Sequence, residues 1–120
     1  MGDPSKALSF YEKALTIHRQ LLSPDHPDLA TSYSNIGNAY CLTGDYSKAL
    51  PSYEKSLAIR QQSLPSNHPN LAASYGNIGN VYFHMGDYSK ALLSHEKSLA
   101  IQQQSLPPNH LDLAASYNNI

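Results

Sequence analysis

The sequence carries little charge. Of its 120 residues, 8 are Lys or Arg and 9 are Asp or Glu, which leaves a formal net charge of −1. Such a chain offers no cluster of cations to neutralise phosphates, so we do not expect it to bind nucleic acid. Its polar residues are mostly Ser, Asn and Gln, which can hydrogen-bond to a partner but attract it only weakly from a distance.

Cysteine and long apolar runs are also scarce. Cys41 is the only cysteine, so there is no internal disulfide framework. No segment approaches the ~18 consecutive apolar residues of a membrane span, and the N-terminus lacks the pattern of a secretory signal. These absences favour an intracellular, cytoplasmic protein with no membrane partner. Met1 directly before half a repeat favours a fragment of a longer array.

A block of 42 residues repeats along the chain. Residues 44–85 and 86–120 agree at 28 of 35 aligned positions, and residues 2–43 form a more diverged copy in the same frame. A fixed period of this length, in units too small to bury their own apolar face, predicts a solenoid of stacked repeats. We therefore expect one array over residues 1–120, divided into a half unit at 2–23, full units at about 27–65 and 69–107, and a truncated unit at 111–120.

The first helix of a unit is predicted from Pro69 to about Met85. Apolar and small residues lie three or four apart there, as along one helix face: Tyr75, Ile78, Gly79, Tyr82 and Met85. A proline is tolerated in the first turn, with His68 or Asn67 as the N-cap. Gly86 follows the last turn, where glycine commonly ends a helix.

A second helix is predicted directly after this glycine. Asp87 can cap it, and it should run to about Leu106, before Pro107 and Pro108. Each unit then consists of two antiparallel helices joined by a Gly-Asp turn. The sequence thus predicts an all-α fold of about six helices.

The units resemble the tetratricopeptide repeat. Seven positions carry that family's pattern of large, small and aromatic residues: Tyr33, Ile36, Gly37, Tyr40, Ala49, Tyr53 and Ser56. The usual period is about 34 residues. The longer unit, with its His-Pro loop and a proline at Pro51, is similar to the repeats of kinesin light chain. Departures are His95 at the aromatic position and Leu111 in place of proline.

This resemblance implies a right-handed superhelical solenoid of antiparallel helix pairs, and a non-enzymatic module that binds protein or peptide. In the family, the first helix of each unit lines a concave groove. The corresponding positions here are Thr31, Ser34, Asn35, Asn38, Cys41 and Leu42 in one copy, Ala73, Gly76, Asn77, Asn80, Phe83 and His84 in the next, and then Asn118 and Asn119.

The asparagines are the most informative of these positions. Each amide offers both donors and acceptors, so it can pair with the backbone of a peptide whatever its side chains are. We expect an extended or helical peptide of low net charge, with Asn38 and Asn80 contributing most. The alternative is that the repeat simply copies these residues and they bond neighbouring helices. A structural spacer with an empty groove is the alternative function.

Other binding modes lack their residues. Some members of the family clamp an acidic C-terminus with Lys and Arg, but the comparable positions hold Thr31, Ser34, Ala73 and Gly76. The loop histidines recur once per unit, so they should lie roughly 20 Å apart, too far to share a metal. These histidines, His26, His68 and His110, are predicted to cap helices and pack the loops.

Catalytic patterns are missing as well. Asp45 and Asp87 are predicted to be helix caps, and Glu54 and Glu96 to lie on a solvated face beside Lys residues. The Gly-Asp-Tyr-Ser-Lys segments lack the spacing of a phosphate loop. We therefore predict no enzymatic activity, no cofactor and no metal.

Head-to-tail self-association is a further expectation. Apolar residues at the two ends of the chain would otherwise face water, and the two half units are complementary, so copies should stack through a heterologous interface. These residues are Leu8, Phe10, Leu15, Leu113, Tyr117 and Ile120.

Overall fold

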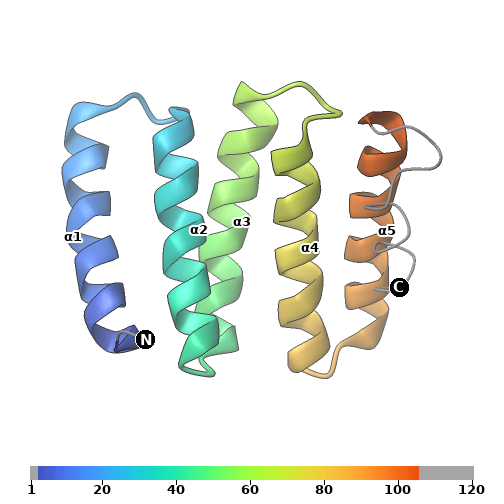
Figure 1. Cartoon of the computed structure of the whole chain (residues 1–120), viewed down its shortest axis with the longest axis horizontal. Helices are drawn as coiled ribbons and strands as arrows, with labels where there is room; N and C mark the ends of the chain where they lie inside the picture. The colour runs from blue at the N-terminus through green and yellow to red at the C-terminus, as the bar shows by residue number, and fades with distance from the viewer. Residues whose placement is uncertain (1–2, 106–120) are drawn as a thin grey trace. The chain divides into compact units, whose positions relative to one another are not determined.

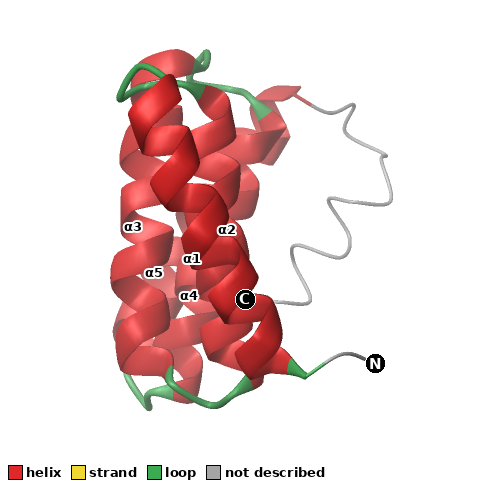
Figure 2. Ribbon diagram, turned by 90° about the vertical axis from the view of Figure 1, so that its left-hand side faces the viewer, coloured by secondary structure: helices red, strands yellow, loops and turns green. Residues whose placement is uncertain are grey.

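The protein is all-α. The computed structural model describes residues 3–105, and within this range the chain forms five helices and no strand (Figures 1 and 2). The helices are α1 Pro4–Leu21, α2 Pro27–Leu42, α3 Tyr46–Ser63, α4 Pro69–His84 and α5 Tyr88–Ser105. The predicted all-α class is confirmed, and five helices compare with about six expected. The truncated unit at 111–120, with Asn118 and Asn119, lies outside the described residues.

The chain divides into two compact units, residues 1–63 and 64–120. In the first unit α2 packs against both α1 and α3, and in the second α4 packs against α5. The α2–α3 pair covers residues 27–63 and the α4–α5 pair residues 69–105, and the division into full units at about 27–65 and 69–107 stays a prediction.

Loop histidines cap the first helix of each pair. The Nδ1 atom of His26 accepts the Asp28 backbone N–H at 3.1 Å, and Nδ1 of His68 accepts that of Asn70 at 3.0 Å. A proline follows each cap at the first helical position, where its missing N–H leaves no bond unmade. The predicted capping role is confirmed for these two histidines, and His110 lies outside the described residues.

A glycine in the left-handed region ends each of these helices. Gly44 has φ of 78° and Gly86 has φ of 84°, a conformation that strains residues with a side chain. The next residue in each copy, Asp45 or Asp87, directly precedes the following helix, and Asp87 Oδ1 accepts the Lys90 backbone N–H at 3.2 Å. Because each turn is so short, the two helices it joins run antiparallel (Figure 1).

The core consists largely of small and aliphatic residues. The buried apolar side chains are Leu29, Ala30, Ile36, Ala39, Ala49 and Tyr53 in the first unit, and Leu71, Ala72, Ile78, Val81, Ala91 and Leu99 in the second. Alanine and serine at helix contacts let the backbones approach closely. Ala49 and Ser56 on α3, for example, are both 0% exposed.

Helix α1 differs from the others in burying none of its residues. Its Phe10 side chain is exposed, as predicted, whereas Leu8 and Leu15 are half-buried. Ile17 and Leu21 are exposed as well, so α1 carries an apolar stripe. Self-association through this stripe stays a prediction.

Candidate functional site

Most of the groove residues predicted for the first copy lie on the part of α2 that is at least partly exposed. Thr31, Asn38 and Leu42 are exposed, while Asn35 and Cys41 are half-buried. These five side chains are neutral and span the length of the helix. They form the first of two asparagine-bearing faces, which we call the α2 face.

Ser34 does not belong to this face, and its prediction as a groove residue is wrong. It is only 8% exposed, and its Oγ lies 2.7 Å from Oγ of Ser56 on α3. Its position around the helix axis directs it to the neighbouring helix. The two hydroxyls satisfy each other in the buried contact, so Ser34 holds the helix pair together.

Tyr53 of α3 reaches through to the α2 face. Its ring lies against Gly37, where an added Cβ would come within 2.7 Å of the ring. Its hydroxyl donates a hydrogen bond to Oδ1 of Asn38. This bond uses the carbonyl end of the amide of Asn38, an exposed residue, and leaves its NH₂ group as a donor.

Cys41 lies beside the same hydroxyl, with 3.7 Å between Sγ and the Tyr53 oxygen. Burial raises the pKa of the Cys41 thiol, although the hydrogen bond with Tyr53 opposes this rise. Burial also raises the pKa of Tyr53 above its ordinary value. Both groups are therefore neutral at physiological pH, and Cys41 is not the thiolate that nucleophilic chemistry requires.

The second copy presents a similar face on α4. Ala73, Asn80, Phe83 and His84 are exposed, and Gly76 and Asn77 are half-buried. This set is the α4 face. Its most apolar member is Phe83, which is 56% exposed. The Phe83 ring meets the ring of Tyr88 edge-on, with 5.3 Å between centroids.

His95 takes the place of Tyr53 behind the α4 face. Its ring lies against Gly79, where an added Cβ would come within 2.8 Å of the ring. Burial lowers the pKa of His95, which favours the neutral ring. Unlike Asn38, Asn80 has a side chain that makes no hydrogen bond to the described part of the chain.

A small pocket adjoins the α2 face, between α1 and α2. It encloses about 230 Å³ and is lined by Phe10, Tyr11, Ala14, His18, Asp28, Thr31, Ser32 and Asn35. The two predicted groove residues Thr31 and Asn35 thus lie together at a cavity. The α1 residues were missed as site residues, although the helical spacing of Phe10, Ala14 and His18 places them on one face.

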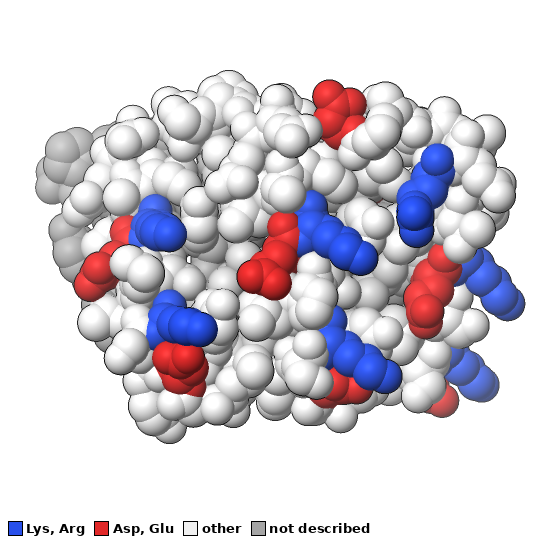
Figure 3. Space-filling model, turned by 180° about the vertical axis from the view of Figure 1, so that it is seen from behind, with Lys and Arg blue, Asp and Glu red and all other residues white. Residues whose placement is uncertain are grey.

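Acidic, histidine and cysteine side chains are scattered over the described range. No three His, Cys, Asp or Glu side chains there come close enough to hold a metal ion. The Lys–Asp ion pairs Lys48–Asp45 and Lys90–Asp87 are exposed, at 3.8 Å each, and stand at helix starts. On the face drawn in Figure 3, charges of both signs are interspersed, without a continuous patch of one sign. None of the described helices has the length and apolar character of a membrane span.

Antiparallel helix pairs, repeated every 42 residues and each presenting one polar face, define a helical-repeat protein. The chain belongs to the tetratricopeptide repeat family, whose profile matches residues 1–62, 52–104 and 70–120. Repeats of this family are in general protein-interaction modules, and proteins built from them are in general non-enzymatic scaffolds.

Solved structures agree with the longer repeat subtype. A candidate kinesin light chain from Podosopora anserina with nearly identical TPR-like repeats is 27% identical, with a TM-score of 0.84 over 94% of this chain and 54% of that one. BtubC (BKLC) from P. vanneervenii is 27% identical, with a TM-score of 0.87 over 97% of this chain and 46% of that one. The chain thus spans about half the length of these structures. The kinesin light chain-like form of the repeat is confirmed.

A more distant structure shares only the fold. The N-terminal domain of STI-1 from C. elegans is 13% identical, with a TM-score of 0.61 over 99% of this chain and 98% of that one. No curated protein matches the chain.

Proposed function

We propose that the chain is a peptide-binding module. The α2 face and the α4 face would each bind an extended or helical peptide of low net charge, through the positions that line the groove in this family. The observation that carries the proposal is the state of the asparagines: Asn35, Asn77 and Asn80 have side chains that make no hydrogen bond to the described residues. An amide that bonds none of the described residues is available to bond a partner.

Asn38 supports the same role in a different way. Its carbonyl oxygen is held by Tyr53, so the amide has a fixed orientation before any ligand arrives. Fixing a group in its bound geometry lowers the entropy cost of binding. The asparagine is also exposed, so its NH₂ group can donate to a peptide carbonyl.

The low net charge proposed for the peptide follows from the residues around the asparagine amides. None of the exposed or half-buried residues of the two faces is Lys, Arg, Asp or Glu. Such a surface has nothing to compensate for the desolvation of a strongly charged peptide. Exposed Phe83 and the pocket beside Asn35 add places for an apolar side chain of the ligand.

The test is an alanine substitution at Asn80. A neutral peptide would first be selected from a random 12-residue library against the full chain, and its affinity then measured by fluorescence anisotropy. We expect Asn80→Ala to weaken binding about tenfold, because a lost hydrogen bond to a buried partner group costs about 1–3 kcal/mol. The melting temperature should not change, because Asn80 bonds nothing else in the described structure.

Asn67→Ala is the matched control. Asn67 is an exposed loop asparagine outside both faces, so its loss should leave the affinity unchanged. Equal affinity of the parent chain and the Asn80→Ala variant would contradict the proposal. It would instead favour the structural spacer, in which only the length of the array matters.

A further inference from the structure

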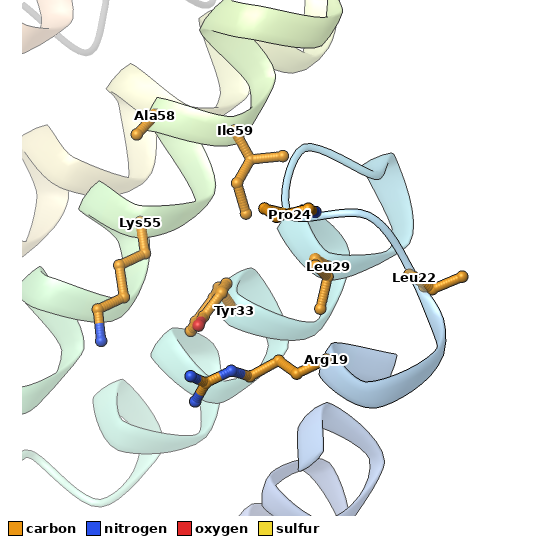
Figure 4. A pocket seen from close by; sticks show the side chains of 8 residues that line it. All are labelled: Arg19, Leu22, Pro24, Leu29, Tyr33, Lys55, Ala58 and Ile59. Carbon is orange, nitrogen blue, oxygen red and sulfur yellow. The ribbon is translucent and has the colours of Figure 1, made fainter. Parts of the chain in front are cut away.

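A second and larger pocket opens in the first unit. It encloses about 460 Å³, and Figure 4 shows the eight side chains that line it: Arg19, Leu22, Pro24, Leu29, Tyr33, Lys55, Ala58 and Ile59. They come from the end of α1, the following loop, the start of α2 and the second half of α3. None of them was predicted as a site residue.

This pocket lies on the opposite side of α2 from the asparagines. Tyr33 lines it, whereas Asn35 belongs to the α2 face. Two residues along a helix of 3.6 residues per turn are separated by about 200° around its axis. A ligand in the pocket would therefore not compete directly with a peptide on the α2 face.

The wall of the pocket is mostly apolar. Leu29 is buried, with 4% of its surface exposed, and Ile59 and Leu22 are half-buried around it. Binding cavities for small ligands run from about 300 to 1,000 Å³, so this one has room for one or two apolar side chains. An apolar group placed there would be removed from water at little cost in broken hydrogen bonds.

Two cations stand beside this apolar wall, and no carboxylate lines the pocket. Arg19 extends from α1 towards Tyr33, and Lys55 stands on the other side of the same ring (Figure 4). The Lys55 Nζ atom lies 5.5 Å from the centre of the Tyr33 ring, a cation–π contact that places the ammonium group beside a ring lining the pocket. The acidic residues next in sequence, Asp25 and Glu54, are not among the lining residues.

The repeat shows which part of this lining is special to the first copy. Six of the eight lining residues recur unchanged 42 positions later, as Leu64, Leu71, Tyr75, Lys97, Ala100 and Ile101. The two that change are Arg19, replaced by Gln61, and Pro24, replaced by Ser66. Packing that is common to the copies can explain the six residues that recur, but it does not explain why Arg19 is an arginine.

We propose that this pocket is a second binding site, which takes an acidic peptide segment. An apolar side chain of the segment would enter the cavity, and flanking carboxylates would pair with Arg19 and Lys55. The combination favours a peptide over nucleic acid, because a phosphate backbone would leave the apolar wall exposed and would meet only two cations.

The probe for the test is the blocked hexapeptide acetyl-Glu-Asp-Leu-Phe-Asp-Glu-amide. Its control is the neutral acetyl-Gln-Asn-Leu-Phe-Asn-Gln-amide, which has the same apolar side chains. Titrated into the full chain with labelled methyl groups, the acidic peptide should give saturable NMR shifts at Leu29 and Ile59. The neutral peptide should bind at least fivefold more weakly, about the size of one exposed ion pair.

Two variants test whether the cations cause the preference for the acidic peptide. Arg19→Gln installs the residue that the next copy carries, and Lys55→Gln removes the second cation. Each should weaken the acidic peptide about fivefold and leave the neutral peptide unchanged. Raising the salt concentration should reduce the difference between the peptides, because salt screens exposed charges.

A third variant fills the cavity. Ala58 is exposed, so Ala58→Trp can fold while its indole occupies the pocket, and it should abolish binding of the acidic peptide. Ala100→Trp, at the equivalent exposed position of the other copy, is the control and should leave binding intact, as should Asn80→Ala on the α4 face.

Three results would overturn this second site: equal affinity for the two peptides, full binding by Ala58→Trp, or tighter binding of a single-stranded oligonucleotide that shifts the same methyl groups. None of them would bear on the neutral peptide proposed for the asparagine faces. The two proposals therefore stand or fall separately.

Discussion

The α2–α3 and α4–α5 pairs share one packing contact but make it with different rings. Tyr53 lies against Gly37 in the first pair, and His95 lies against Gly79 in the second, at nearly the same distance. Any side chain on either glycine would push the ring away. The glycine is therefore needed opposite the ring, whether that ring is a phenol or an imidazole.

The polar atoms of the two rings differ in whether they bond the asparagine on the proposed binding face. The Tyr53 hydroxyl reaches Asn38 and fixes its amide, whereas Asn80 in the second pair makes no hydrogen bond to the described residues. One substitution between copies thus changes an anchored amide into a free one without changing the helix pair. In repeats of this kind, a substitution on the second helix can change the surface of the first helix while the core packing is kept.

The largest effect is expected from removing the ring of the first pair. Tyr53 is 4% exposed, so Tyr53→Ala should lower the free energy of unfolding by about 3 kcal/mol, as truncation of a buried aromatic side chain does. His95→Ala should cost less, because His95 is only half-buried. Denaturant unfolding of the two variants would check this order. Equal losses would mean that the two rings contribute alike to stability.

A smaller effect is expected at the caps, where the two pairs should behave alike. His68→Ala removes the acceptor for the Asn70 N–H and should cost about 1 kcal/mol, as the loss of an N-cap usually does. His68→Asn should retain most of the stability, since asparagine caps well. The same two changes at His26 should give the same result in thermal melts. A much larger loss at one site would show that its histidine does more than cap.

The smallest effect is a pH dependence of the free energy of unfolding, which we expect from the α4–α5 pair and not from the α2–α3 pair. Burial lowers the pKa of His95 in the folded chain below its ordinary 6.5. Between these two values the unfolded chain binds a proton that the folded chain does not, so the free energy of unfolding falls as the pH drops below about 6.5. Above that pH the ring is neutral in both states and contributes no pH dependence.

Two reciprocal variants measure this contribution. His95→Tyr should reduce the drop in melting temperature between about pH 7.5 and about pH 5.5, because it removes the titrating ring. Tyr53→His should increase the drop by placing an imidazole in the same setting in the first pair. An unchanged drop in the His95→Tyr variant would show that other groups cause the pH dependence.

The helix limits could be predicted because local residues set them. Proline at a first turn and glycine just past a last turn act within a few residues, so the predicted helix from Pro69 to about Met85 is observed as Pro69–His84, with Met85 as its C-cap. The loop histidine was predicted as one of two possible caps, and the structure selects His68 over Asn67.

Features that depend on contacts between helices could not be predicted in this way. Ser34 has the helical spacing of a groove residue, but only the position of Ser56 on α3 shows that it is buried. Lys55 is exposed, as a solvated face would have it, but its contact with the ring of Tyr33 on another helix could not be predicted. Lys55 on α3 and Arg19 on α1 line the same pocket, and no local sequence pattern predicts that they come together.

The most direct test of the peptide-binding account is an NMR spectrum of the asparagine side-chain amides during titration with the selected neutral peptide. We predict saturable shifts of the Asn35, Asn38, Asn77 and Asn80 NH₂ signals, with Asn67 unchanged. Without peptide, the Asn38 side-chain amide should already be less mobile than that of Asn80, because Tyr53 bonds it. Tight binding that leaves all four signals unmoved would contradict the account.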